Sequence, residues 1–169
     1  IFEAAGVKLN DIEVIGDPSS AVRVNFNTNR GPREVDYLPW IQLQGNSLNQ
    51  DDFITNQLNT VNVGTAGSLL VEPKSGLEYT PLLTASLSSG LIEKNSIIAA
   101  TDPSSLIDNF NSDEKEHLIA VRISGQYLSA FPDSIIEPGK SKETEESPKD
   151  RNHLIESEIS ANLIIVADT

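Results

Sequence analysis

Two uninterrupted apolar runs in the last third of the chain constrain its fold more than any other feature. The first spans residues 117–124 and the second lies in residues 161–169, with its apolar centre at 163–167. Short runs of this kind, rich in β-branched residues, are typical of strands covered on both faces, as in parallel sheets. We therefore predict that residues 117–124 and 163–167 are buried strands of a central sheet in a soluble α/β domain.

A charged segment separates the two runs. Residues 137–158 contain seven acidic residues (Glu137, Glu143, Glu145, Glu146, Asp150, Glu156 and Glu158) and four basic ones (Lys140, Lys142, Lys149 and Arg151). Few apolar side chains are available there to offset the entropy lost on ordering. We predict a mobile surface loop over residues 137–158.

The charge of the whole chain restricts its partners. Acidic residues number 25 against 12 Lys and Arg, giving a formal net charge of −13. Such a surface repels polyanions, so nucleic acid and anionic lipid are not expected partners.

Length and ends suggest one domain cut from a larger protein. The 169 residues suit a single domain over residues 1–169. Cysteine is absent, which excludes disulfides, thiol nucleophiles and Cys-based metal sites. No run approaches the about 20 apolar residues that span a bilayer. The chain starts without Met in what resembles a helix end and stops just past a strand. We expect a segment of a longer protein.

Local signals predict several further elements. Gly6 is suited to a left-handed helix cap after residues 2–5, and Asp102 followed by Pro103 is a helix start. Residues 61–71 and 77–84 are predicted to be two strands joined by a turn. Pro39 makes any strand at residues 37–43 an edge or irregular one.

Two aspartates are candidates for ligand binding. Asp168 ends a predicted parallel strand, and Asp17 follows a short apolar segment. Open α/β sheets bind ligands at the carboxyl ends of their strands. Each Asp could bind a ligand or cap a turn, and capping is favoured because the chain has no Gly-rich phosphate loop.

The other candidates are aromatic. Tyr37 and Trp40 flank Pro39 and could form a recognition ledge, although a lone Trp more often packs in a core. His117 and His153 lack metal-ligand spacing, and Ser68 has no nucleophile motif. No catalytic constellation, metal site or cofactor site is predicted from the residues.

Several short motifs, in a fixed order along nearly the whole chain, carry a resemblance to a known family. They occupy residues 2–10, 35–40, 79–86, 121–132 and 161–169. Together they resemble the auxiliary component of ABC-type transport systems linked to gliding motility, an uncharacterised bacterial family.

This resemblance implies a Rossmann-like layered sheet with flanking helices, related to class I glutamine amidotransferases. The sheet would be incomplete here, since the family's opening βαβ unit is expected upstream of Ile1. Without cysteine the chain lacks the amidotransferase nucleophile.

The resemblance further implies a non-catalytic binding or interaction module of a transport-system auxiliary protein. The module would face the periplasm, anchored to the inner membrane by segments outside this chain, with the permease and ATPase subunits as partners and homo-oligomerisation left open. The alternatives are a small-ligand (solute) binding domain, with Asp17 and Asp168 near the ligand, and a carboxylate-dependent hydrolase.

Overall fold

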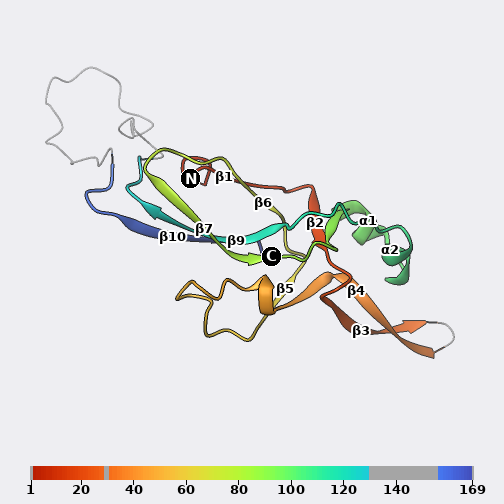
Figure 1. Ribbon diagram of the computed structural model, residues 1–169. Coiled ribbons are helices and arrows are strands. Elements are labelled where there is room, and N and C mark those ends of the chain that lie inside the picture. The colour runs from red at the N-terminus through yellow and green to blue at the C-terminus, as the bar shows by residue number, and fades with distance from the viewer. Residues whose placement is uncertain (1, 29–30, 130–155, 169) are drawn as a thin grey trace, which may run out of the picture.

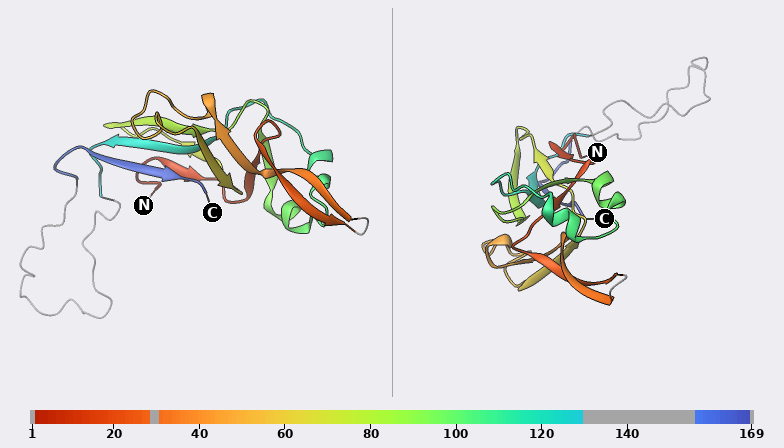
Figure 2. Two further views of the ribbon diagram at one scale, coloured as in Figure 1. Left: turned by 90° about the horizontal axis from the view of Figure 1, so that it is seen from below. Right: turned by 90° about the vertical axis from the view of Figure 1, so that its right-hand side faces the viewer.

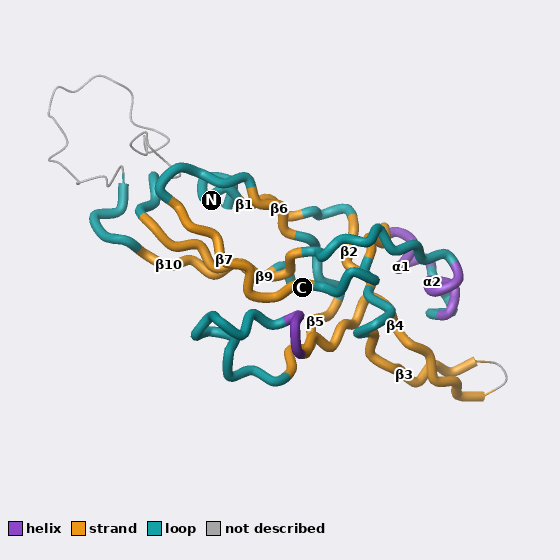
Figure 3. The backbone as a smooth tube through the Cα atoms, in the orientation of Figure 1, coloured by secondary structure: helices purple, strands orange, loops and turns teal. Residues whose placement is uncertain are grey.

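The computed structural model describes residues 2–28, 31–129 and 156–168, and strands dominate its backbone (Figure 3). In chain order the strands are β1 (Val7–Leu9), β2 (Glu13–Gly16), β3 (Ala21–Thr28), β4 (Gly31–Gln44), β5 (Thr60–Gly64), β6 (Leu69–Val71), β7 (Leu77–Thr84), β8 (Gly90–Glu93), β9 (Leu118–Gly125) and β10 (Ala161–Val166). Helices in these residues are limited to the 3-10 turn η1 (Gly45–Ser47), α1 (Lys94–Ala99) and α2 (Ser104–Asp108).

The strands form four small sheets whose pairs are all antiparallel in the described residues. Two sheets have three strands, in the orders β10-β9-β7 and β3-β4-β5. The other two are the pairs β1-β6 and β2-β8. The molecule is elongated, with the N-terminus beside β1 at one end and the β3–β4 hairpin, next to the two helices, at the other (Figures 1 and 2).

The predicted α/β, Rossmann-like layered sheet is therefore wrong. No parallel pair occurs among the described strands, and α1 and α2 have only six and five residues. Both apolar runs are strands, as predicted, but they are adjacent antiparallel strands: Leu163 pairs with Ile123, and Ile165 pairs with Val121. Both faces of β9 are covered, but by other strands and loops and not by helices.

Strand β9 joins two hydrophobic cores. Its first half contributes Ile119 and Ala120 to a core built with β2, β4, β5 and β7. Its second half contributes Val121 and Ile123 to a core with β1, β6 and the end of β10. β9 is thus buried on both faces, as predicted. The prediction that residues 163–167 are a buried strand is wrong for one face of β10, because Ile165 is buried while Ile164 and Val166 are exposed.

Most predictions of local features agree with the structure, unlike the predicted architecture. Gly6 has φ +72° and ends a turn over the preceding residues, as expected. The carboxylate of Asp102 accepts the N–H of Ser104 at the start of α2. β7 covers the predicted residues 77–84. Residues 61–71, predicted as one strand, hold parts of two, because β5 pairs with β4 while β6 pairs with β1.

The segment 137–158, predicted to be a mobile loop, lies largely outside the described residues. Its last three residues continue the β9–β10 hairpin, since Glu156 bridges to Leu128 and the N–H of Ser157 donates to the carbonyl of Tyr127. Within the described part of the chain, no helix has the length and apolar character needed to span a bilayer.

Candidate functional site

A wide bulge in β4 creates the most distinctive surface of the molecule. Val22 of β3 pairs with Tyr37, but the preceding Ala21 pairs with Ile41, so the intervening β4 residues have no partner on β3. Pro39 lies in this interruption, where its missing N–H breaks no ladder bond. The prediction of an irregular strand around Pro39 is confirmed.

The bulge brings together the two predicted aromatic candidates. The rings of Tyr37 and Trp40 meet edge to face, with 5.5 Å between centroids and planes at 79°. Trp40 is 47% exposed, so it is not a core residue. With Phe26 these two residues form what we call the aromatic ledge.

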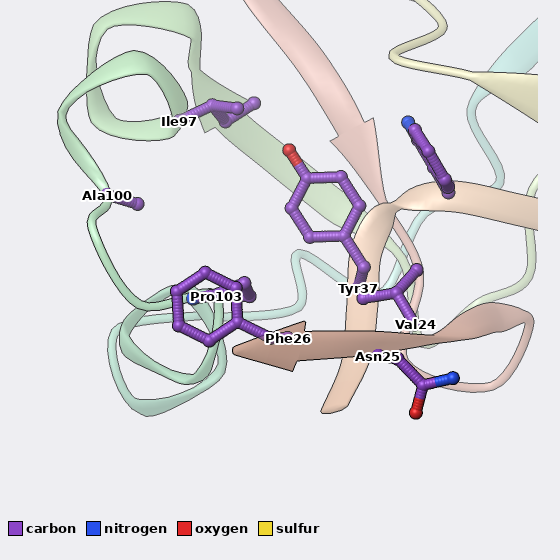
Figure 4. A pocket seen from close by; sticks show the side chains of 8 residues that line it. Val24, Asn25, Phe26, Tyr37, Ile97, Ala100 and Pro103 are labelled. Atoms are coloured by element: carbon purple, nitrogen blue, oxygen red, sulfur yellow. The ribbon is translucent and has the colours of Figure 1, made fainter. Parts of the chain in front are cut away.

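The aromatic ledge is one wall of a hollow between the β3–β4 hairpin and the helical segment (Figure 4). The hollow has a volume of about 330 Å³ and carries no charged side chain in its lining, which consists of Val24, Asn25, Phe26, Tyr37, Trp40, Ile97, Ala100 and Pro103. This size is at the lower limit of small-molecule sites. An apolar hollow with one amide suits a protruding hydrophobic side chain better than a polar metabolite.

Two hydrogen-bond donors border the hollow. In Figure 4 the hydroxyl of Tyr37 points from the β3–β4 hairpin toward Ile97 of α1. Burial raises the pKa of Tyr37, which keeps the phenol protonated at neutral pH. Among the described residues, neither this hydroxyl nor the indole N–H of Trp40 has a hydrogen-bond partner. Both groups are therefore available to a bound molecule.

Gly64 on the neighbouring strand supports Trp40. The two residues are directly paired in the β4–β5 ladder. A Cβ on Gly64 would lie 3.7 Å from the indole Cδ1 and Nε1 of Trp40. The indole thus covers the glycine backbone, which stabilises a strand position without a side chain.

Asp168 reaches the same place from the end of the chain. Its Oδ1 accepts the N–H of Gly64 at 2.9 Å, and its side chain is otherwise exposed. Two sequence candidates, Trp40 and Asp168, thus meet at Gly64. The structure therefore gives Asp168 a hydrogen bond to the last residue of β5, 104 residues away in sequence.

Asp17 lies elsewhere and is completely buried. Its carboxylate accepts three hydrogen bonds of 2.9 Å, from the N–H of Ser19 and from the N–H and Oγ of Ser86. These bonds satisfy the carboxylate inside the protein. Asp17 and Asp168 are not brought together, and the antiparallel sheets provide no shared carboxyl edge for them.

Ser68, His117 and Asp113 form a Ser–His–Asp arrangement that was not predicted from the sequence. The Oγ of Ser68 lies 3.5 Å from His117 Nδ1, and His117 Nε2 lies 3.0 Å from Asp113 Oδ1. Burial is the largest single effect and favours a higher pKa for Asp113, but the hydrogen bond and charge of His117, together with the backbone N–H and charge of Lys115, lower that pKa. Ser68 and His117 are buried, so in this structure the three side chains form a network inside the protein.

The buried ion pair between Arg122 and Asp52 was also not predicted from the sequence. Arg122 of β9 donates to Asp52 Oδ2 through Nε at 2.8 Å and through a terminal nitrogen at 2.7 Å. Burial is the largest single effect and favours a higher pKa for Asp52, but the hydrogen bonds from the Ile54 amide and Arg122, together with the positive charge of Arg122, lower that pKa. The two partners are 70 residues apart in sequence, so no local pattern could pair them.

The described residues contain no group of three or more His, Asp and Glu side chains placed to hold a metal ion. His153 lies outside these residues.

The comparisons with known proteins give one match. A family model described as an ABC-type uncharacterized transport system matches residues 1–169. Neither a curated protein nor a solved structure matches the chain.

Proposed function

The chain belongs to the family of ABC-type uncharacterized transport systems, and from this membership we propose that it is a non-catalytic interaction module of a transport-system auxiliary protein. The module faces the periplasm, as in gliding-motility systems, and is held at the inner membrane by segments outside this chain. Its direct partner is the permease, through which it associates with the ATPase.

The observation that carries the proposal is the aromatic ledge in a chain of this family. A half-exposed Trp and a partly buried Tyr line this uncharged hollow. Trp and Tyr side chains are common anchors at protein interfaces. The Tyr37 hydroxyl and the Trp40 indole N–H can each donate a hydrogen bond to a partner segment and so fix its orientation. A membrane subunit with an exposed apolar side chain matches this chemistry.

The alternative of a carboxylate-dependent hydrolase has less support. The carboxylates of Asp17 and Asp52 are buried and fully engaged by hydrogen bonds within the protein. Small-ligand binding is also disfavoured, because only the Asn25 amide, the Tyr37 hydroxyl and the Trp40 indole offer polar groups in the hollow.

The test is co-purification from solubilised membranes of the source cells, using the tagged full-length protein. We expect the permease and ATPase encoded with it to be recovered and identified by mass spectrometry. Trp40→Ala should reduce their recovery about tenfold, the scale of an interface anchor. The matched control is Phe2→Ala, which removes another half-exposed aromatic (54%) that lies outside the aromatic ledge.

Equal recovery with Trp40→Ala and wild type would remove the aromatic ledge from the proposal. Turnover in a broad hydrolase screen, with no transport subunit recovered, would overturn the proposed function itself.

A further inference from the structure

Strand β10 presents an unpaired edge. In the described residues its only neighbour in the sheet is β9. The N–H of Ala167 donates to Ile119, which continues the β9–β10 register. Backbone groups of alternate residues point to opposite sides of an antiparallel strand. Ala161, Leu163 and Ile165 therefore face β9.

The intervening residues direct their backbone groups outward. Asn162, Ile164 and Val166 each present an N–H and a C=O to the open side of β10. No described residue is hydrogen bonded to these six groups. The side chains of Ile164 and Val166 are 47% and 49% exposed. The edge thus combines a hydrogen-bonding template with apolar side chains.

Strand β10 lacks the usual protection of an edge. Its six residues, Ala161–Val166, include no charged residue, no Pro and no Gly. Proteins normally protect long edges with such residues or with bulges, and the β9–β10 register runs without a shift. An extended segment can therefore add to β10 without breaking an existing bond.

Charge identifies the kind of segment that fits. Residues 156–168 carry three carboxylates, Glu156, Glu158 and Asp168, and no basic residue. These acids lie at both ends of the edge and attract Lys or Arg. A second copy of the chain is disfavoured, because antiparallel pairing of two β10 strands sets the acidic start of one against the acidic end of the other, and each chain carries −13.

We infer that β10 accepts an extended segment of a partner protein as a fourth strand of the β10-β9-β7 sheet. The segment has β-branched or aliphatic side chains at alternate positions and basic residues at its ends. This surface differs from the aromatic ledge, and the inference does not depend on the transporter association.

The experiment uses the full chain and a labelled synthetic peptide, Lys-Lys-Val-Thr-Ile-Thr-Val-Lys-Lys, with binding measured by fluorescence anisotropy at low ionic strength. A peptide with Glu in place of every Lys is the comparison. We expect the Lys peptide to bind at least about tenfold more tightly, the scale of a few exposed ion pairs. Hydrogen exchange should slow at Ile164 and Val166 when the Lys peptide binds.

Two variants separate the backbone edge from the charge. Ile164→Pro removes one outward N–H without touching a β9 bond and should weaken binding of the Lys peptide about tenfold, whereas Ile164→Thr keeps that N–H and should bind more tightly than the Pro variant. The double variant Glu156→Lys/Glu158→Lys should reduce the preference for the Lys peptide, because only Asp168 of the three carboxylates then remains.

Absence of binding by the Lys peptide, or equal affinity of wild type and a folded Ile164→Pro, would overturn the inference. It would also be overturned if the wild-type chain dimerises in light scattering and Ile164→Pro makes it monomeric, since the edge would then belong to a second copy.

Discussion

The buried Asp52–Arg122 ion pair makes the sharpest stability prediction. The Asp52 side chain is 1% exposed and the Arg122 side chain 19%. Replacing Arg122 by Met keeps most of the apolar stem but leaves a buried carboxylate without its cation. Breaking a buried pair from one side costs about 3–5 kcal/mol. We expect a loss near the lower end, about 3 kcal/mol, because Arg122 is partly in contact with water.

The pH dependence should change sign as well. The pKa of Asp52 is lowered in the folded protein, so the pair contributes stability above the unfolded pKa of about 3.9. That contribution is lost as the pH falls through the lower, folded pKa. Without Arg122, burial dominates and raises the folded pKa. The Arg122→Met variant should therefore gain stability relative to wild type as the pH falls from neutral toward 4.

Urea unfolding of both proteins, followed by circular dichroism from pH 7 to pH 4, measures both effects. Adding Asp52→Asn to Arg122→Met should return stability to within about 1–2 kcal/mol of wild type, since no charge is left buried. The control is Lys8→Met, which breaks the Lys8–Glu72 pair, also 2.7 Å long but with side chains 47% and 57% exposed. It should change stability little. A small loss in Arg122→Met, with an unchanged pH profile, would refute the reasoning.

Two further predictions concern buried hydrogen bonds and backbone space. Asp17→Asn should destabilise the fold by about 2–3 kcal/mol in urea unfolding, because an amide donor would face the N–H or O–H of Ser86, and an unchanged midpoint would contradict this. Gly125→Ala should cost more, about 3 kcal/mol or above, since φ is +143° and a Cβ there would run into the carbonyl of Gly76. At Gly45, with φ +56° and open space around it, the same change should cost only about 1 kcal/mol, and equal losses at both sites would argue against the close contact.

The sequence allowed prediction of features that depend on neighbouring residues. The left-handed Gly6, the hydrogen bond from Ser104 to Asp102 at the start of α2, the bounds of β7 and the irregularity at Pro39 are all local. The strand character of β9 and β10 was also predictable, because an apolar β-branched run favours an extended backbone wherever it is placed.

Architecture was not predictable in the same way. The residues of β9 must be covered on both faces, but nothing in their order says whether helices or strands cover them. Nor does the order show that β10 folds back onto β9 across the charged segment. The wrong α/β prediction followed from treating coverage on both faces as a sign of parallel strands.

The candidate residues of the site could be predicted from the sequence, but their arrangement could not. Tyr37 and Trp40 were chosen because of their chemistry, but their exposure depends on a bulge and on the distant Gly64. The network from Ser68 to His117 links residues 49 apart in sequence. Of that network, only the four-residue spacing of Asp113 and His117 was visible in the sequence.

The aromatic ledge and the edge of β10 both contact the region around Gly64. A variant of one surface can therefore disturb the other, and a control for this is needed. The two residues after β10 are hydrogen bonded to the end of β5 and the loop that follows it: the carbonyl of Ala167 accepts the N–H of Gly67, and the carboxylate of Asp168 accepts the N–H of Gly64. Trp40 lies on Gly64 and is the only Trp in the chain. Its emission therefore reports whether a change in β10 has disturbed the aromatic ledge. A variant such as Ile164→Pro that loses the peptide but keeps the emission of Trp40 has lost the strand edge alone, so its effect on transport-subunit recovery can be assigned to β10.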